Sequence, residues 1–131
     1  MKIICDTHVL LFWADAPEQL SNKATRTLRD GMRNQQMACA DISLWEIAML
    51  AEKGRITPQE PVDLYIADII AAMALEVLPI SPEIAALSQT TLLQHQDPAD
   101  RLIAATTLHH KARLVTKDRK LQAFRAIETL W

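Results

Sequence analysis

The chain has 131 residues, of which 50% are hydrophobic and only two are glycine, a composition that predicts one compact domain spanning residues 1–131. Its formal net charge of −2 comes from 14 basic and 16 acidic side chains, which excludes binding of nucleic acid through overall charge and leaves only local phosphate contacts. No stretch approaches the roughly 18 apolar residues of a membrane helix, and Cys5 and Cys39 have apolar neighbours typical of reduced core thiols, so we expect a cytoplasmic protein without membrane contact.

The sequence alternates between short apolar runs and amphipathic runs. Strands are expected where apolar and β-branched residues cluster, and helices where apolar residues recur at helical spacing. In chain order we expect a strand at 2–5, a helix from 9, a surface helix at 21–34, a strand at 37–40, a helix at 41–54, a buried helix at 62–75, a strand at 76–80, a helix from 82 to about 93, a helix from 97, a strand at 113–116, a short helix at 118–124 and an edge strand at 127–130. This alternation indicates a three-layer α/β/α fold with a central parallel sheet of four to five strands.

Four acidic residues recur at equivalent places in this pattern, each just after an apolar run or in the first turns of the next helix. Because a parallel sheet brings such positions to one edge, the four carboxylates are expected to meet there. Carboxylates at one site repel one another unless a cation binds them, and hard ions such as Mg²⁺ take oxygen ligands. The chemistry favoured by this arrangement is phosphodiester hydrolysis by metal-activated water. This acidic quartet consists of Asp6, Glu46, Asp100 and Asp118.

Each acid also has a purely structural explanation, the capping of a helix. Asp97, in front of Pro98, is typical of an N-cap and would place Asp100 in the first helical turn. Ser43 and Glu46 match the S-x-x-E capping box. The other two acids of the quartet could cap the helices that follow them. The two explanations are compatible, because a helix N-terminus at the carboxyl edge of a sheet is itself a binding position.

Four short segments, spread over almost the whole chain, carry the quartet. They are CDTHVLL at 5–11, SLWEIA at 43–48, DPADRLIAA at 97–105 and LVTKD at 114–118. Together and in this order they resemble the PIN domain family, and more narrowly the VapC-type toxins of type II toxin–antitoxin pairs. The resemblance implies an Mg²⁺- or Mn²⁺-dependent endoribonuclease that acts as a toxin. It also implies an RNA substrate, a cognate antitoxin as partner and a homodimer.

The resemblance also assigns roles to individual residues. It implies that the quartet is catalytic and binds the metal, with Asp6 and Asp100 favoured as direct ligands. Thr116 matches a hydroxyl position that supports the site in this family, and Asp97 is assigned to capping and ligand orientation rather than to the metal. Thr7 and Ser43, which lie inside the matching segments, are placed with these supporting residues.

Basic residues concentrate near the C-terminus, where residues 101–125 carry seven of them against one acid. Such a bias could hold a phosphate backbone beside the metal. Arg101, Lys117 and Arg119, next to the proposed ligands, are the candidates for RNA contact. Lys111 and Arg113 are favoured as ordinary surface charges.

The histidines and tryptophans are given ordinary roles. None of the four histidines has zinc-ligand spacing with cysteine, and His8 is expected to be the only one near the site. Trp13 and Trp45 lie on apolar helical faces, which favours core or interface packing over base stacking. The helices around Trp45 and at 62–73 carry surplus apolar surface, which suggests an oligomer or a groove for an antitoxin segment.

Two other functions match parts of the same pattern. A phosphatase could use Asp6 as a covalent nucleophile, but that signature has a second aspartate two positions later, where this chain has His8. A non-catalytic PIN-fold module could bind RNA or protein while its acids only cap helices.

Overall fold

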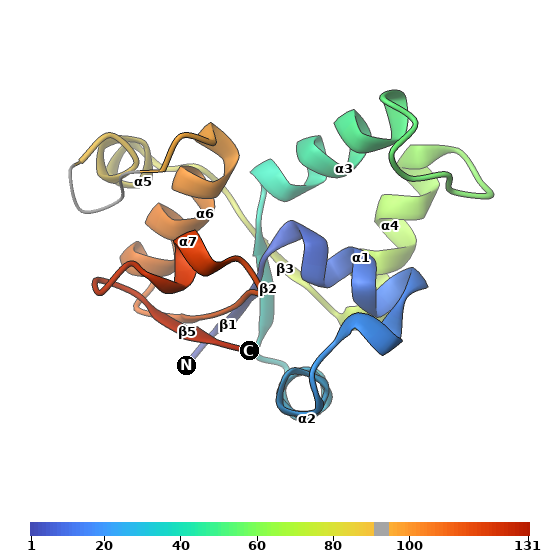
Figure 1. The fold of residues 1–131 in the computed structure, drawn as a ribbon, viewed down its shortest axis with the longest axis horizontal. Helices are drawn as coiled ribbons and strands as arrows, with labels where there is room; N and C mark the ends of the chain where they lie inside the picture. The colour runs from blue at the N-terminus through green and yellow to red at the C-terminus, as the bar shows by residue number, and fades with distance from the viewer. Residues whose placement is uncertain (91–94) are drawn as a thin grey trace.

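A computed structural model of the protein describes residues 1–90 and 95–131, which form one five-stranded sheet covered by helices on both faces (Figure 1). All strand pairs are parallel, in the order β3-β2-β1-β4-β5. The strands are β1 (Ile3–Cys5), β2 (Met37–Ala40), β3 (Glu76–Leu78), β4 (Arg113–Val115) and β5 (Glu128–Leu130). The predicted parallel sheet and the edge strand near the C-terminus are therefore confirmed.

Two of the helices begin after a serine whose hydroxyl caps them. The hydroxyl of Ser21 accepts from the backbone N–H of Ala24 at 2.9 Å, and Ser81 does the same for Ile84 at 3.1 Å. The helices are α1 (Thr7–Asp15), α2 (Asn22–Arg33), α3 (Ile42–Glu52), α4 (Val62–Met73), α5 (Pro82–Leu87), α6 (Pro98–His109) and α7 (Arg119–Gln122), with a 3-10 turn η1 (Pro17–Gln19) that was not predicted. Across the described ranges, no helix has the length and apolar character needed to cross a membrane.

The helix predicted from 82 to about 93 is too long. It ends at Leu87, where the hydroxyls of Ser88 and Thr90 donate to the carbonyls of Ala85 and Leu87 at 2.7 and 2.8 Å. Hydroxyl groups that bond to nearby carbonyls in this way compete with helix continuation. Residues 91–94 of the predicted helix lie outside the described residues.

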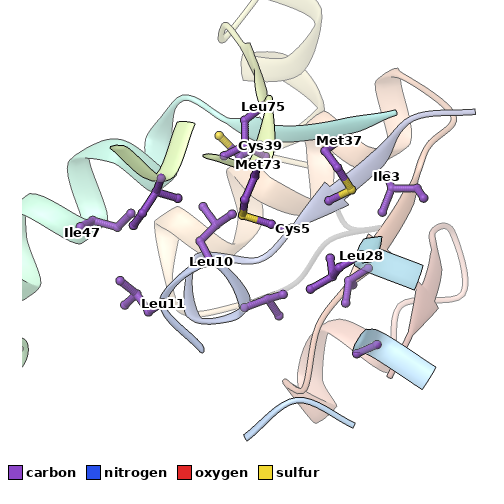
Figure 2. Close-up of a cluster of buried hydrophobic side chains, with 14 of the residues drawn as sticks. Ile3, Cys5, Leu10, Leu11, Leu28, Met37, Cys39, Ile47, Met73 and Leu75 are labelled. Carbon is purple, nitrogen blue, oxygen red and sulfur yellow. The ribbon is translucent and has the colours of Figure 1, made fainter. Parts of the chain in front are cut away.

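Successive strand residues point into two separate hydrophobic clusters. In β1, Ile3 and Cys5 join the cluster beneath α1, α2, α3 and α4, whereas Ile4 joins the cluster beneath α5 and α6. This alternation follows from the two-residue period of a strand, and Figure 1 shows the two helical layers on opposite sides of the sheet. Figure 2 shows the first cluster, with labelled side chains that include Leu10, Leu28, Met37 and Met73. Both cysteines are free and buried in it, as predicted.

The order of the strands creates a crevice between β1 and β4. The chain leaves β1 toward β2 on one side and leaves β4 toward β5 on the other, so the connections diverge at this pair. The two strands end together, with Cys5 opposite Val115, and the backbone N–H of Asp6 donates to the carbonyl of Val115 at 3.1 Å. Ligand sites of open parallel sheets lie at such a point, outside the carboxyl ends of the strands.

Candidate functional site

All four members of the acidic quartet line one cavity of about 360 Å³ at this carboxyl edge. They come from four parts of the chain: the end of β1, α3, the first turn of α6 and the loop between β4 and α7. The lining residues are Asp6, His8, Phe12, Glu46, Asp97, Asp100, Lys117 and Asp118. The predicted convergence of the four acids is therefore what the fold produces.

Asp6 is a buried acceptor that does not cap its helix. It precedes α1, but its side chain makes no capping hydrogen bond, so the capping explanation is wrong for this residue. Oδ2 instead accepts from the hydroxyl of Thr116 at 2.8 Å, and Oδ1 is buried without a hydrogen-bond partner among the described residues. Burial raises the pKa of Asp6, while the bond from Thr116 opposes that rise. A buried carboxylate oxygen left in this state is a natural position for a cation ligand.

Glu46 is held by two hydroxyl groups. The Oγ1 atom of Thr7 lies 2.5 Å from Oε1 of Glu46 and 2.9 Å from the Oγ atom of Ser43. A hydroxyl has one proton, and the carboxylate is the stronger acceptor, so the Thr7 hydroxyl donates to Glu46 and accepts a hydrogen bond from the Ser43 hydroxyl. The predicted capping box is wrong, because Asp41 precedes α3 and Ser43 lies inside the helix. Burial is the main cause that raises the pKa of Glu46.

The start of α6 carries two acids with different contacts. Oδ1 of Asp97 accepts from the backbone N–H of Ala99 at 2.9 Å, which confirms the predicted N-cap. Asp100 lies in the first turn, and burial followed by the nearby charge of Asp6 raises its pKa to about 8. Carboxylate oxygens of Glu46, Asp97 and Asp100 lie within 4.8 Å of one another. Asp97 thus combines its capping bond with a place among the possible ligands.

Asp118 both caps a helix and lines the cavity. Its Oδ1 atom accepts from the backbone N–H groups of Lys120 and Leu121 at 2.7 and 3.3 Å, which caps α7 as expected. Its own N–H donates to the hydroxyl of Thr116 at 3.0 Å. The second oxygen is not used by the cap, and Asp118 still lines the cavity with the rest of the quartet. Thr116 was predicted to support the site, and it contacts Asp6 and Asp118 together.

His95 was not predicted at this site. Its Nε2 atom lies 3.2 Å from Oδ2 of Asp100 and 3.8 Å from Oδ2 of Asp118, and its side chain is only 6% exposed. The expectation that His8 alone among the histidines lies near the site is therefore wrong. The signal available in the sequence was position, since His95 lies two residues before Asp97, the first residue of the DPAD segment.

The three basic candidates differ in how they relate to the cavity. Lys117 lines it, with Nζ 6.0 Å from the ring centroid of Phe12. Arg119 is exposed at the start of α7, and Arg101 is half-buried one residue after Asp100. Only Lys117 of the three is among the residues that line the described cavity.

A second cavity of about 480 Å³ adjoins the first and shares Glu46 and Asp97 with it. Trp45 lines this second cavity and is 59% exposed. The predicted packing of Trp45 in the core is therefore wrong, and its exposure fits the other prediction, packing at an interface. Its other lining residues are Ile42, Met49, Lys53, Pro98, Ala99 and Leu102. The surface beside the acids is therefore apolar.

The donor set of the first cavity suits a hard divalent cation. Its acids offer carboxylate oxygens, which Mg²⁺ and Mn²⁺ accept together with water and phosphate oxygens. The buried, unpaired oxygen of Asp6 and the raised pKa values of Asp6, Glu46 and Asp100 fit a site whose negative charge requires a counterion. The residues that could hold the ion are those of the quartet, with Asp97 beside them.

The chain from residue 3 to residue 127 matches the PIN domain family. It is also 36% identical over 124 residues to Ribonuclease VapC22 of Mycobacterium tuberculosis (strain ATCC 25618 / H37Rv), an alignment covering 94% of this chain and 92% of that protein. The chain therefore belongs to the PIN domain family, and within it to the VapC-type branch that the sequence motifs indicated.

Solved structures share the fold at lower sequence identity. The crystal structure of VapBC2 from Rickettsia felis bound to a promoter DNA fragment contains a chain with a TM-score of 0.77 and 18% identity, covering 99% of this chain and 98% of that one. A chain of DNA-bound VapBC from Salmonella typhimurium has a TM-score of 0.72 and 18% identity, covering 99% of this chain and 97% of that one. A chain of FitAcB from Neisseria gonorrhoeae has a TM-score of 0.66 and 18% identity, covering 98% of this chain and 96% of that one. At this identity the likeness concerns the fold.

Proposed function

We propose that this protein is an Mg²⁺- or Mn²⁺-dependent endoribonuclease that acts as the toxin of a toxin–antitoxin pair. The observation that carries the proposal is the convergence of the acidic quartet, from four parts of the chain, on one cavity at the switch point of the sheet. The sequence relative named as a ribonuclease, VapC22, supports the RNA substrate.

The acidic quartet and the side chains around it have specific roles in this proposal. The quartet binds the cation, with Asp6 and Asp100 as direct ligands, and Thr116 and Thr7 hold two of these carboxylates by hydrogen bonds. When bound, such a cation activates water as a nucleophile and offsets the charge of the phosphate. Lys117, at the rim, contacts the RNA backbone, and Arg101 and Arg119 extend that contact along the strand.

The burial of the acids supports this proposal over a non-catalytic binding module. A surface that only capped helices would not need to bury the carboxylates of Asp6 and Glu46, which are 4% and 6% exposed. Of the quartet, Asp118 alone caps a helix through its side chain among the described helix starts. Burial of charge without a cap favours a cation site over a structural role.

We also propose an antitoxin partner and a homodimer. The complexes of VapB with VapC among the structural neighbours support the partner. Two large apolar side chains, Trp45 and Leu64, are 59% and 51% exposed on different helices, α3 and α4. Exposed apolar groups of this size are typical of interaction surfaces. The cavity beside Trp45 is the proposed antitoxin surface, and the face around Leu64 is the proposed dimer contact.

The test is cleavage of RNA by the purified protein. RNA should be cut in the presence of Mn²⁺ or Mg²⁺, EDTA should stop the reaction, and Asp6→Asn and Asp100→Asn should each abolish it. Asp30→Asn is the matched control, because Asp30 is an exposed acid on α2 that pairs with Arg33 and does not line the cavity of the quartet. Circular dichroism should show the parent fold in all three variants.

Two results would count against the proposal in different ways. If Asp6→Asn and Asp100→Asn cut RNA as fast as the parent, the cation site is wrong. If the parent binds RNA but never cuts it with either cation, the non-catalytic module is correct. Growth arrest on expression, relieved by the cognate antitoxin, tests the toxin role separately.

A further inference from the structure

His95 occupies a buried position between two members of the quartet that come from different elements. Its Nε2 atom lies 3.2 Å from Oδ2 of Asp100, at the start of α6, and 3.8 Å from Oδ2 of Asp118, ahead of α7. The side chain is 6% exposed, and its ring meets the ring of Phe124 edge-on with centroids 6.4 Å apart. The imidazole is thus fixed by packing as well as by its polar contacts.

The other ring nitrogen determines where the proton of the imidazole lies. Nδ1 of His95 accepts a hydrogen bond from the backbone N–H of Asp97 at 3.0 Å. A nitrogen that accepts a hydrogen bond carries no proton, so the ring is neutral and its single proton is on Nε2. The group that His95 presents to the two carboxylates is therefore an N–H donor, with no lone pair for a metal ion.

This tautomer separates His95 from the ligands. A ring nitrogen of His95 and carboxylate oxygens of Asp100 and Asp118 lie within 4.8 Å of one another, close enough for a mixed nitrogen–oxygen metal site. Nε2 could bind a cation, however, only if its proton moved to Nδ1. That move would set two N–H groups against each other at Asp97. His95 is also absent from the described residues that line the cavity, whereas both carboxylates line it. The imidazole therefore lies behind the two acids.

We propose that His95 is a positioning residue that holds Asp100 and Asp118 in place through one N–H group and leaves their other lone pairs to the cation. Nε2 is buried without a hydrogen-bond partner among the described residues, at 3.2 and 3.8 Å from the two Oδ2 atoms, so a small shift of either carboxylate would complete a hydrogen bond. A donor between two like charges also lowers their mutual repulsion. The site then keeps oxygen ligands only, which suits Mg²⁺ and Mn²⁺.

This inference rests on the proposed cation site and goes beyond it, because it assigns a role to a residue outside the quartet. It makes a claim about the metal-free protein that needs no activity measurement. Long-range ¹H–¹⁵N spectra of the histidine rings should show His95 protonated at Nε2 and unprotonated at Nδ1. The same pattern should persist after saturation with Mg²⁺. A proton on Nδ1, or protons on both nitrogens, would overturn the proposal.

Two variants test the consequence for metal binding. His95→Phe keeps the ring packing against Phe124 but removes both the donor at Nε2 and the acceptor for the N–H of Asp97, and it should weaken Mn²⁺ binding about 10- to 100-fold, the usual effect of losing a group that orients a ligand. His95→Gln places an amide N–H near the position of Nε2 and should recover most of that affinity. His109→Phe, at an exposed position of α6, should bind as the parent does.

Mn²⁺ binding is measured from the electron paramagnetic resonance signal of the free ion. If His95→Phe binds Mn²⁺ as the parent does while remaining folded, or if His95→Gln is as weak as His95→Phe, the positioning role is wrong. If the parent binds no Mn²⁺, both the proposed cation site and the positioning role of His95 are wrong. If Mn²⁺ binding and the tautomer are as expected but RNA is not cut, the proposed function fails while the role of His95 stands.

Discussion

The hydroxyl of Thr116 donates to Oδ2 of Asp6 at 2.8 Å, joining residues 110 positions apart in the chain. Asp6 follows β1 and Thr116 follows β4, so this bond joins the carboxyl ends of the two strands at which the chain connections diverge. The same oxygen of Thr116 accepts from the backbone N–H of Asp118 at 3.0 Å. One hydroxyl therefore fixes two members of the acidic quartet relative to each other.

Replacing Thr116 by valine should weaken the cation site. Valine has nearly the same shape but lacks the hydroxyl, so Asp6 loses a donor and the N–H of Asp118 loses an acceptor. We expect a 10- to 100-fold loss of Mn²⁺ affinity or of cleavage rate, and about 1–3 kcal/mol of stability, from these unsatisfied buried groups. Thr116→Ser keeps the hydroxyl and should retain most of both. Equal behaviour of the two variants in kinetics and thermal unfolding would contradict this role.

The raised pKa of Asp100 predicts a pH-dependent stability in the absence of cations. Its value is 3.8 for the free side chain and about 8 in the folded protein, chiefly because of burial. Between these values the folded state holds a proton that the unfolded chain has released, so Asp100 destabilises the fold progressively as pH rises toward 8. Below 3.8 both states are protonated and the contribution vanishes.

The measurement is the melting temperature against pH in EDTA and in Mg²⁺. In EDTA the parent should lose stability over this interval relative to Asp100→Asn, which cannot ionise. Mg²⁺ replaces the proton, so it should flatten the curve of the parent and leave that of the variant unchanged. Parallel curves for parent and variant in EDTA would show that Asp100 ionises normally.

Lys117 should contribute to RNA binding more than to the chemical step. It lines the cavity, beside Phe12, where it can meet a phosphate. Lys117→Met should raise KM with a smaller change in kcat and reduce the salt dependence of RNA binding by about one phosphate contact. Lys111→Met is the matched control, because Lys111 is an exposed lysine that does not line this cavity. An equal effect of both changes would indicate a diffuse electrostatic contribution.

Trp45 should matter for antitoxin binding and little for folding. Because it is 59% exposed, Trp45→Ser removes little buried surface, and the melting temperature should change only slightly. Central aromatic groups of an interface often contribute 2 kcal/mol or more, so we expect a loss of antitoxin affinity of roughly 30-fold or greater. Leu64→Ser, at a comparably exposed apolar residue of α4, should leave that affinity intact. Calorimetric titration with the cognate antitoxin distinguishes these outcomes.

The two cysteines should be unreactive in the folded protein. Burial raises the pKa of Cys39 to about 12 and that of Cys5 still further, and both side chains are 0% exposed. Only a thiolate reacts with a disulfide reagent, so modification should require unfolding. Ellman's reagent should detect no thiol in the native state and two in guanidinium. Rapid labelling of either cysteine in the native protein would show that the first hydrophobic cluster opens readily.

Much of the fold could be predicted because strands, helices and caps depend on neighbouring residues. The strands of the structure fall inside the predicted runs, and Asp97 caps α6 as expected. Ser21 and Ser81, which lie at the starts of two other predicted helices, also cap them. The gathering of three of the acids could also be predicted, because Asp6, Glu46 and Asp118 each come after a strand, β1, β2 or β4, and the carboxyl ends of parallel strands share one edge. Asp100 lies at the start of α6, which follows α5 in the chain, so its place at this edge also depends on how α6 packs.

The contacts of individual side chains could not be predicted in the same way. Ser43 and Glu46 have the spacing of a capping box, but the fold brings Thr7 close enough to take both groups. Gly31 resembles a weak point of a helix, yet a Cβ there would lie 2.4 Å from Sδ of Met37, so its small size serves the contact between α2 and β2. The first case depends on a residue at least 36 positions away, and the second on how α2 packs against the strand that follows it.

By itself, then, the sequence determined the periodicities, the parallel sheet and the set of four acids, because these follow from the order of residue types. The tertiary structure decided that Thr116 donates to Asp6, that Thr7 donates to Glu46, and that Trp45 is exposed. Such properties depend on the distance and direction between atoms from separate elements. Those quantities are fixed only when the layers pack together, and no local pattern encodes them.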